Sequence, residues 1–86
     1  MMFPKNAAIR LKGKELAALR LERFRRDNET CLNCGERVYF TARFAGDPLA
    51  YDMAHIKSRG AGGSDTISNV ETWCHRCHMR FHNGGK

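Results

Sequence analysis

The sequence predicts a small α+β domain that depends on a bound metal ion for its stability. Three observations lead to this fold class. The chain has 86 residues, and a domain of that length buries a small fraction of its surface and usually needs a staple such as a metal ion or disulfides. Its four cysteines fall into two closely spaced pairs. Helical patterns occur near both ends of the chain, and extended patterns lie between them.

The first third of the chain combines an irregular arm with a helix. Residues 1–12 contain a proline and scattered basic residues, so we expect a basic arm there and a single domain over residues 13–86. Residues 13–26 have a strongly helical composition. Apolar side chains recur in this segment at helical spacing, at Ala17, Leu21 and Phe24, with Leu16 and Leu19 widening the stripe. The pattern predicts an amphipathic helix that packs this stripe against the rest of the domain.

Two strands and a second helix are expected in the remainder of the chain. Residues 37–44 are rich in β-branched and aromatic side chains, which favours a strand, and residues 49–56 are expected to form a second one. Residues 59–65 form a glycine-rich loop. Residues 68–73 are interpreted as a connection, and the last helix is expected from about residue 75 to residue 82.

The cysteines form two CxxC pairs, Cys31 with Cys34 and Cys74 with Cys77. Nothing at the start of the chain is similar to a secretory leader, and no apolar stretch is long enough to span a bilayer. We therefore expect a cytoplasmic protein, in which thiols stay reduced and paired cysteines indicate a metal site rather than disulfides.

The spacing favours one closed tetrahedral site for a structural zinc ion, bound by all four thiolates. Two other interpretations are less consistent with the pattern. Buried apolar cysteines would not occur in the same CxxC spacing twice, and a redox-active CxxC is usually surrounded by a βαβ pattern that this chain lacks. Four sulfur ligands leave no open coordination position, so the zinc ion is expected to stabilise the fold and not to take part in chemistry.

The formal net charge of +6 indicates a polyanionic partner. Eight of the fifteen lysines and arginines precede Cys31, against four acidic residues in the same stretch. The basic character is therefore concentrated in the N-terminal third. Charge alone does not distinguish DNA, RNA and anionic lipid.

All four histidines lie in the second half of the chain. His78 and His82 are four residues apart on the expected last helix, so their rings face one side and can bind one metal ion. His55 is expected at the end of a strand, directly before the glycine-rich loop, and Asn69 lies between these histidines in sequence. His75 lies within the second CxxC pair on a different helix face, and we assign it no catalytic role.

These residues together resemble the signature of the HNH endonuclease family. The matching stretches occur in the family's order: Asp52-Met53-Ala54-His55-Ile56, Gly62-Gly63, Asn69-Val70 and Cys74-His75-Arg76-Cys77-His78. The basic helix followed by Cys31-Leu32-Asn33-Cys34-Gly35 is similar to the zinc-bearing HNH proteins of phages and bacteria. The resemblance covers roughly residues 20 to 83. It implies a ββα-metal (His-Me finger) fold with an N-terminal basic helix, and a metal-dependent endonuclease or nickase acting on DNA.

The resemblance also implies a role for each matched residue. His55 corresponds to the general base that activates water for attack on the scissile phosphate, and Asn69 to the asparagine that holds this base and the connecting loop. His78 and His82 correspond to ligands of a divalent catalytic ion, which would be Mg²⁺, Mn²⁺, Ni²⁺ or Zn²⁺. A phage or a bacterial host, and phage packaging proteins as partners, are family-level expectations only.

One position departs from the family pattern. Most members have Asp, His or Glu immediately before the catalytic histidine, as a metal ligand, whereas this chain has Ala54. Asp52 lies two residues earlier, on the same face of the expected strand. Either Asp52 supplies the ligand, or His78 and His82 hold the ion together with waters, or catalysis is impaired.

Two alternatives to a nuclease therefore stay open. The first is a catalytically degenerate domain that binds nucleic acid without cutting it, and the second is a zinc-stapled adaptor for other proteins. In the nuclease and in the degenerate domain, phosphates would be bound by basic residues near the motif, namely Lys57, Arg59, Arg76 and Arg80. The sequence does not predict the oligomeric state.

Overall fold

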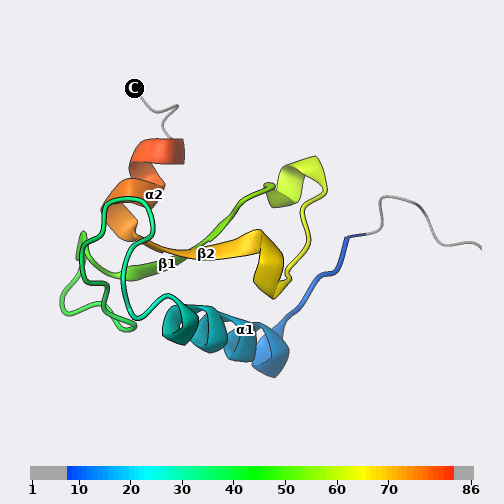
Figure 1. The fold of residues 1–86 in the computed structure, drawn as a ribbon, viewed down its shortest axis with the longest axis horizontal. Coiled ribbons are helices and arrows are strands. Elements are labelled where there is room, and N and C mark those ends of the chain that lie inside the picture. Colours follow the sequence, from blue (N-terminus) through cyan, green and yellow to red (C-terminus); the bar gives the residue numbers. More distant parts are fainter. Residues whose placement is uncertain (1–7, 83–86) are drawn as a thin grey trace, which may run out of the picture.

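The computed structural model describes residues 8–82, the last of these by its backbone alone. Two helices, α1 (Gly13–Arg26) and α2 (His75–His82), lie on opposite sides of a pair of strands, β1 (Tyr51–His55) and β2 (Val70–Cys74) (Figure 1). Two single-turn 3₁₀ helices, Arg59–Ala61 and Ile67–Asn69, punctuate the loop that joins the strands. The architecture confirms the predicted α+β class. No helix of the described residues is long and apolar enough to cross a membrane.

The two strands form an antiparallel pair in which Tyr51 lies opposite Cys74 and His55 lies opposite Val70. β1 falls within the segment that the sequence predicted as a strand, whereas β2 replaces the expected connection over residues 68–73. The prediction missed β2 because the segment is rich in polar residues. Its burial alternates with the period of a strand, since Val70, Thr72 and Cys74 are fully buried and the two residues between them are not.

The strand predicted over residues 37–44 is not formed. This segment makes only isolated bridges, between Thr30 and Arg37 and between Tyr39 and Ala50. The chain turns back because the Asp47 carboxylate accepts hydrogen bonds from the backbone N–H groups of Arg43 (2.9 Å) and Leu49 (3.0 Å).

The aromatic side chains that made this segment strand-like are not buried, although the Phe40 ring packs at the edge of the core, 5.2 Å from the ring centre of Phe24. Val38 is fully buried, but Phe40 and Phe44 are exposed. Tyr39 is half-buried and has the Arg43 guanidinium stacked 4.1 Å from its ring centre. These side chains favour a strand by composition, but they lie at the surface and the segment does not pair as a strand.

Helix α1 begins and ends where the sequence predicted, and it packs through only part of the predicted stripe. Leu19 and Phe24 are buried, whereas Ala17 and Leu21 of the predicted stripe are exposed. The inward face carries polar contacts instead. The Tyr51 hydroxyl donates to the backbone carbonyl of Arg20 (2.8 Å), which anchors the helix to β1.

The end of α1 is tied to β2 through Asp27. The buried Asp27 carboxylate accepts a hydrogen bond from the backbone N–H of Thr72 (2.9 Å) and pairs with Arg23 one turn earlier. Arg23 also donates to the carbonyl of Ile67 (3.0 Å), just before β2. A paired, buried carboxylate thus attaches the end of α1 to β2, in addition to the apolar contacts of the helix.

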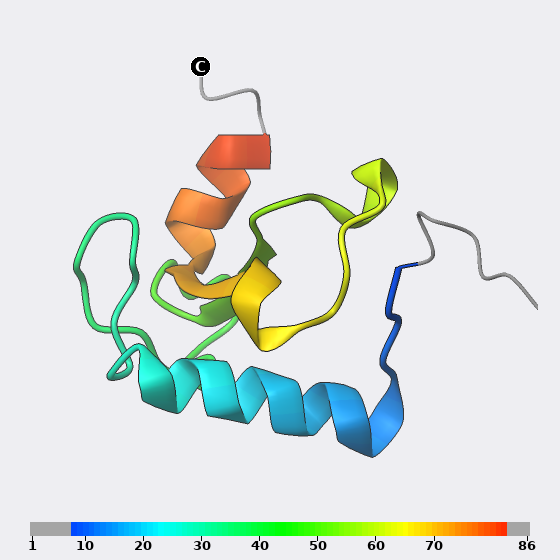
Figure 2. The ribbon, with the colours of Figure 1, turned by 45° about the vertical axis from the view of Figure 1, so that its right-hand side comes forward.

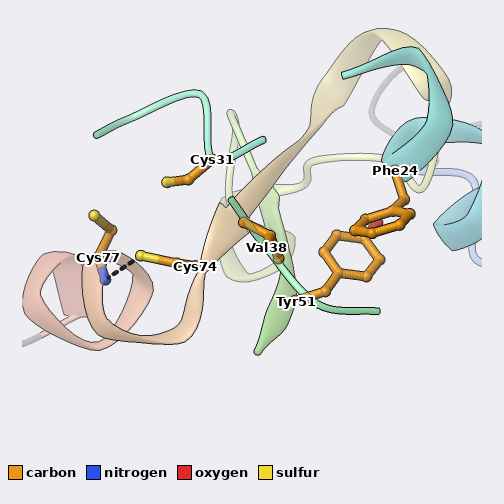
Figure 3. Packing of buried hydrophobic residues seen from close by; sticks show 6 residues of the cluster. All are labelled: Phe24, Cys31, Val38, Tyr51, Cys74 and Cys77. Carbon is orange, nitrogen blue, oxygen red and sulfur yellow. Dashed lines mark hydrogen bonds between the residues drawn. The ribbon is translucent and has the colours of Figure 1, made fainter. Parts of the chain in front are cut away.

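The core is small, and its main cluster of packed residues is half cysteine. Figure 3 shows its six buried residues, which come from α1, the segment before β1, both strands and α2: Phe24, Cys31, Val38, Tyr51, Cys74 and Cys77. The rings of Phe24 and Tyr51 pack 5.1 Å apart between their centres. Apolar burial on this scale stabilises a fold only weakly, so the three cysteines must contribute more than their apolar surface.

The described end of the N-terminal arm lies along the loop that joins the strands (Figure 2). Ile9 accepts a hydrogen bond from the Asp65 N–H (2.8 Å) and donates to the Ser64 hydroxyl (2.9 Å). The Leu11 N–H donates to the Asp65 carboxylate (2.9 Å). Residues 1–7 lie outside the described residues, so the division at residue 12 between arm and domain stays a prediction.

Candidate metal centre and active site

The four cysteines come together as the sequence predicted. Their sulfur atoms all lie within 4.8 Å of one another, and the Sγ atoms of Cys34 and Cys74 are 3.9 Å apart. Zinc–sulfur bonds of about 2.3 Å in a tetrahedron place the sulfurs about 3.8 Å apart. The four cysteines are thus positioned to bind a metal ion such as zinc. Figure 3 shows three of them, Cys31, Cys74 and Cys77, converging from separate segments.

Local backbone geometry positions each cysteine pair. Cys31 and Cys34 lie on a tight turn that Gly35 closes, donating its N–H to the Cys31 carbonyl (2.8 Å) with a φ of 82° that favours glycine. Cys74 ends β2 and Cys77 lies in the first turn of α2, with its N–H 3.4 Å from the Cys74 sulfur.

Burial raises the pKa of the Cys74 thiol. Without a cation this sulfur would keep its proton, whereas the thiolate form binds metal. A bound cation would offset the cost of burying thiolates, so the chemistry of the cysteine set fits a metal ion.

A second centre is formed by a pocket of about 510 Å³ between the strand pair, α2 and the loop after β1. Its lining includes His55 and Ala54 of β1, Glu71 of β2, His78 of α2 and Arg59 of the loop. The structure thus brings together the expected base, one expected ion ligand and the position where the family's usual ligand is replaced by alanine.

His55 is held by a buried carboxylate that the sequence analysis did not single out. Its Nε2 lies 2.8 Å from Oδ1 of Asp65, whose side chain is fully buried. Arg59 pairs with the same carboxylate and lowers the pKa of Asp65 well below its ordinary value. An ionised carboxylate only accepts hydrogen bonds, so Nε2 of His55 carries the proton. In the neutral ring, Nδ1 is then the basic nitrogen.

The side chain of Asn69 fastens the loop between the strands. Its Oδ1 accepts from the Lys57 N–H (2.9 Å), and its Nδ2 donates to the carbonyls of Lys57 (3.0 Å) and Ser64 (2.9 Å). Gly63 makes this closed loop possible, since a Cβ there would lie 1.8 Å from the Lys57 carbonyl oxygen. These contacts suit the expected role in the loop, and the Asn69 carbonyl also accepts a hydrogen bond from the N–H of Ile56, the residue after His55 (2.8 Å).

Asp52 lies behind the α2 histidines. Its Oδ2 is 2.9 Å from Nδ1 of His78 and also 2.9 Å from Nδ1 of His75, a residue to which the sequence analysis gave no role. A carboxylate on one ring nitrogen is the usual outer partner of a metal-binding histidine, because it orients the ring and increases its basicity. The opposite nitrogen of His78, Nε2, is then the one suited to bind an ion. The hypothesis that Asp52 is itself a ligand stays a prediction.

The remaining predicted site residues are placed as follows. His82 ends α2, and its side chain lies outside the described residues, so its role stays a prediction. The proposed phosphate-binding residues are exposed, Lys57 and Arg59 in the loop and Arg76 and Arg80 on α2. Arg59 is also engaged with Asp65, so it has a structural function besides any contact with phosphate.

Two acidic residues of the site were missed. Asp65 follows the glycine loop in a basic chain, and that isolated acid was the only signal available from the sequence. Glu71 could be recognised as a site residue only from the strand register, which places it directly opposite Ala54.

A short strand pair covered by a helix, with a histidine-lined pocket and four cysteines positioned to bind a metal ion, matches the ββα-metal class of domain. The HNH endonuclease family model matches residues 31–84, and the chain belongs to this family. Membership implies a nuclease type of function and binding to nucleic acid. No curated protein matches the chain.

Proposed function

We propose that the protein is a metal-dependent DNA endonuclease or nickase in which His55 is the general base. The observation that carries this proposal is the 2.8 Å contact between His55 and the buried, Arg59-paired Asp65, at a pocket that His78 also lines. A histidine oriented by an ionised carboxylate is a common arrangement for proton transfer near neutral pH.

In the proposed reaction, Asp65 keeps the proton on Nε2 of His55, so Nδ1 accepts a proton from the water that attacks the phosphodiester. His78, oriented by Asp52, would hold the catalytic ion together with His82. When bound, a divalent ion would polarise the phosphate and stabilise the leaving oxygen. The four cysteines would hold a separate zinc ion that maintains the fold.

Plasmid cleavage tests the proposal. Zinc-loaded protein is incubated with supercoiled plasmid in Mg²⁺, Mn²⁺, Ni²⁺ or added Zn²⁺, and nicked and linear products are separated on a gel. We expect cutting with at least one of these ions and none in excess EDTA over times at which the structural zinc is retained. Folded protein that leaves the plasmid intact under every condition would argue against a nuclease.

Ala54 favours the second candidate, a domain that binds nucleic acid without cutting it. The position lines the pocket but carries only a methyl group. Such a domain would bind DNA with the same charge dependence as the nuclease, and plasmid would stay intact with all four ions.

DNA binding should depend steeply on salt and little on sequence, because the exposed basic residues suit phosphate contacts. The affinity for DNA should fall about 100-fold between 50 and 200 mM salt if each of the four proposed phosphate-binding residues neutralises one phosphate. These residues are Lys57, Arg59, Arg76 and Arg80. Fluorescence anisotropy with several duplexes measures this affinity. The double substitution Lys57→Gln, Arg80→Gln should reduce the slope by about two, and Glu22→Gln should not reduce it. Salt-independent binding would favour the protein adaptor.

Replacing Asp65 with asparagine should reduce cleavage about 100-fold, because the neutral amide no longer fixes the tautomer of His55. Ring ¹⁵N chemical shifts of His55 should show the loss of the Nε2–H tautomer, which a purely structural role would not predict. Asp47→Asn is the matched control, since Asp47 is equally buried and also pairs with an arginine, Arg43, but lies outside the pocket. Folded Asp65→Asn protein that cuts at the original rate would remove Asp65 from the mechanism.

A further inference from the structure

We propose that Glu71 supplies the carboxylate ligand that the family's usual position, here Ala54, lacks. The proposal rests on the proposed function in that it concerns the same ion site. It assigns the metal-binding carboxylate to β2 instead of β1, and it assigns Asp52 to the orientation of His78.

The register of the two strands places Glu71 next to the position of the missing ligand. Glu71 lies directly opposite Ala54, and Trp73 lies directly opposite Asp52. Side chains of directly opposed residues are on the same face of an antiparallel pair, with Cβ atoms about 4.5–5.5 Å apart. The Glu71 side chain therefore starts one strand away from the position where a ligand is expected, on the same face.

Contacts with α2 identify this face as the one next to the expected ion. Asp52 contacts His78, and the Trp73 ring packs against His78 and against Phe81 of the same helix, with ring centres 6.5 and 5.6 Å apart. Glu71, His78 and Ala54 line one pocket. A carboxylate and an imidazole thus face the same hollow from β2 and from α2.

Asp52 is poorly placed to be the ligand itself. Its Oδ2 is shared by Nδ1 of His75 and Nδ1 of His78, each 2.9 Å away. It is also absent from the pocket lining, whereas Glu71 is part of it. This arrangement matches an outer carboxylate that orients a histidine ligand.

The Glu71 carboxylate is held in place by its neighbour on the strand. The indole Nε1 of Trp73 donates to Oε1 of Glu71 (3.0 Å), and ligating carboxylates are commonly fixed by such hydrogen bonds. Among the described side chains, only the cysteines form a closed set of three or more ligands. A site built on Glu71 and His78 would instead leave coordination positions for water or substrate, as a catalytic ion requires.

The test is Mn²⁺ binding, measured by electron paramagnetic resonance on zinc-loaded protein without DNA. Glu71→Gln keeps an oxygen that can accept the Trp73 hydrogen bond, but it loses the charge that binds the ion. We expect Mn²⁺ affinity to fall at least about 10–100-fold. Removing a residue that only hydrogen-bonds to a metal ligand typically costs that much, and removing the ligand itself should not cost less. Glu22→Gln on the exposed face of α1 removes the same charge away from the pocket and should leave the affinity unchanged.

A second variant separates ligation from folding. Adding Ala54→Asp to Glu71→Gln restores a carboxylate on the opposite strand and should recover most of the lost affinity. Unchanged Mn²⁺ affinity in folded Glu71→Gln protein would overturn the assignment of Glu71, even if the wild-type protein cuts DNA. Weakened binding in that variant, with no cutting by the wild type, would support Glu71 as a ligand and overturn the nuclease function.

Discussion

Replacing His55 with alanine should lower the rate of DNA cleavage by about 10²–10⁴-fold, the usual contribution of a general base. The physical reason is the fixed tautomer, since the ionised Asp65 accepts a hydrogen bond from Nε2–H of His55 and Nδ1 is then the nitrogen that can accept a proton from water. Single-turnover cleavage with excess protein measures the loss. DNA affinity and zinc content should change little, because His55 belongs neither to the cysteine site nor to the proposed phosphate-binding residues.

His55→Asn is the companion variant. Its amide can still donate to the buried Asp65 carboxylate and so preserve the pairing of Asp65 with Arg59, but it cannot act as a base. It should therefore be as inactive as His55→Ala. If either variant cut at the original rate, His55 would have no part in the reaction, and a base would have to be sought elsewhere in the pocket.

Local patterns in the sequence were sufficient for the elements with strong periodicity or paired ligands. Helix α1 was predicted over the residues that form it, α2 and β1 were located, and the cysteine site was anticipated from spacing alone. Local patterns failed where tertiary contacts decide. Residues 37–44 have strand-like side chains but no partner strand, and β2, a short mixture of polar and apolar residues, is paired and buried through its register with β1.

The candidate site shows the same division. His55, His78 and Asn69 could be identified because their order and spacing resemble a family signature, and the structure brings the first two to one pocket. Asp65 and Glu71 could not be identified in that way. Asp65 reaches His55 because the loop folds back onto the end of β1. Glu71 reaches the pocket because the register of the two strands places it opposite Ala54. Neither relation is a short-range property of the chain.

Removal of zinc should have the largest effect on stability, and we expect chelation to unfold the protein. Three of the six residues in the main core cluster are cysteines of the candidate metal centre, and the remaining apolar core is small. Binding of a structural zinc ion contributes an apparent 10–16 kcal/mol in zinc-finger peptides, about as much as or more than the net stability of a typical domain. A core of this size would not offset that loss.

Two measurements on one sample check the prediction. Metal analysis of freshly purified protein should find about one zinc per chain, and circular dichroism should show loss of helix when a strong chelator removes it and recovery when zinc is restored. Cys77→Ser should bind zinc weakly and unfold, because Cys77 is buried at the centre. Leu32→Ala, on the same turn as Cys31 but half exposed, should retain the metal. A stably folded chain without bound metal would contradict the proposed role of the four cysteines, since the core would then be sufficient without the ion.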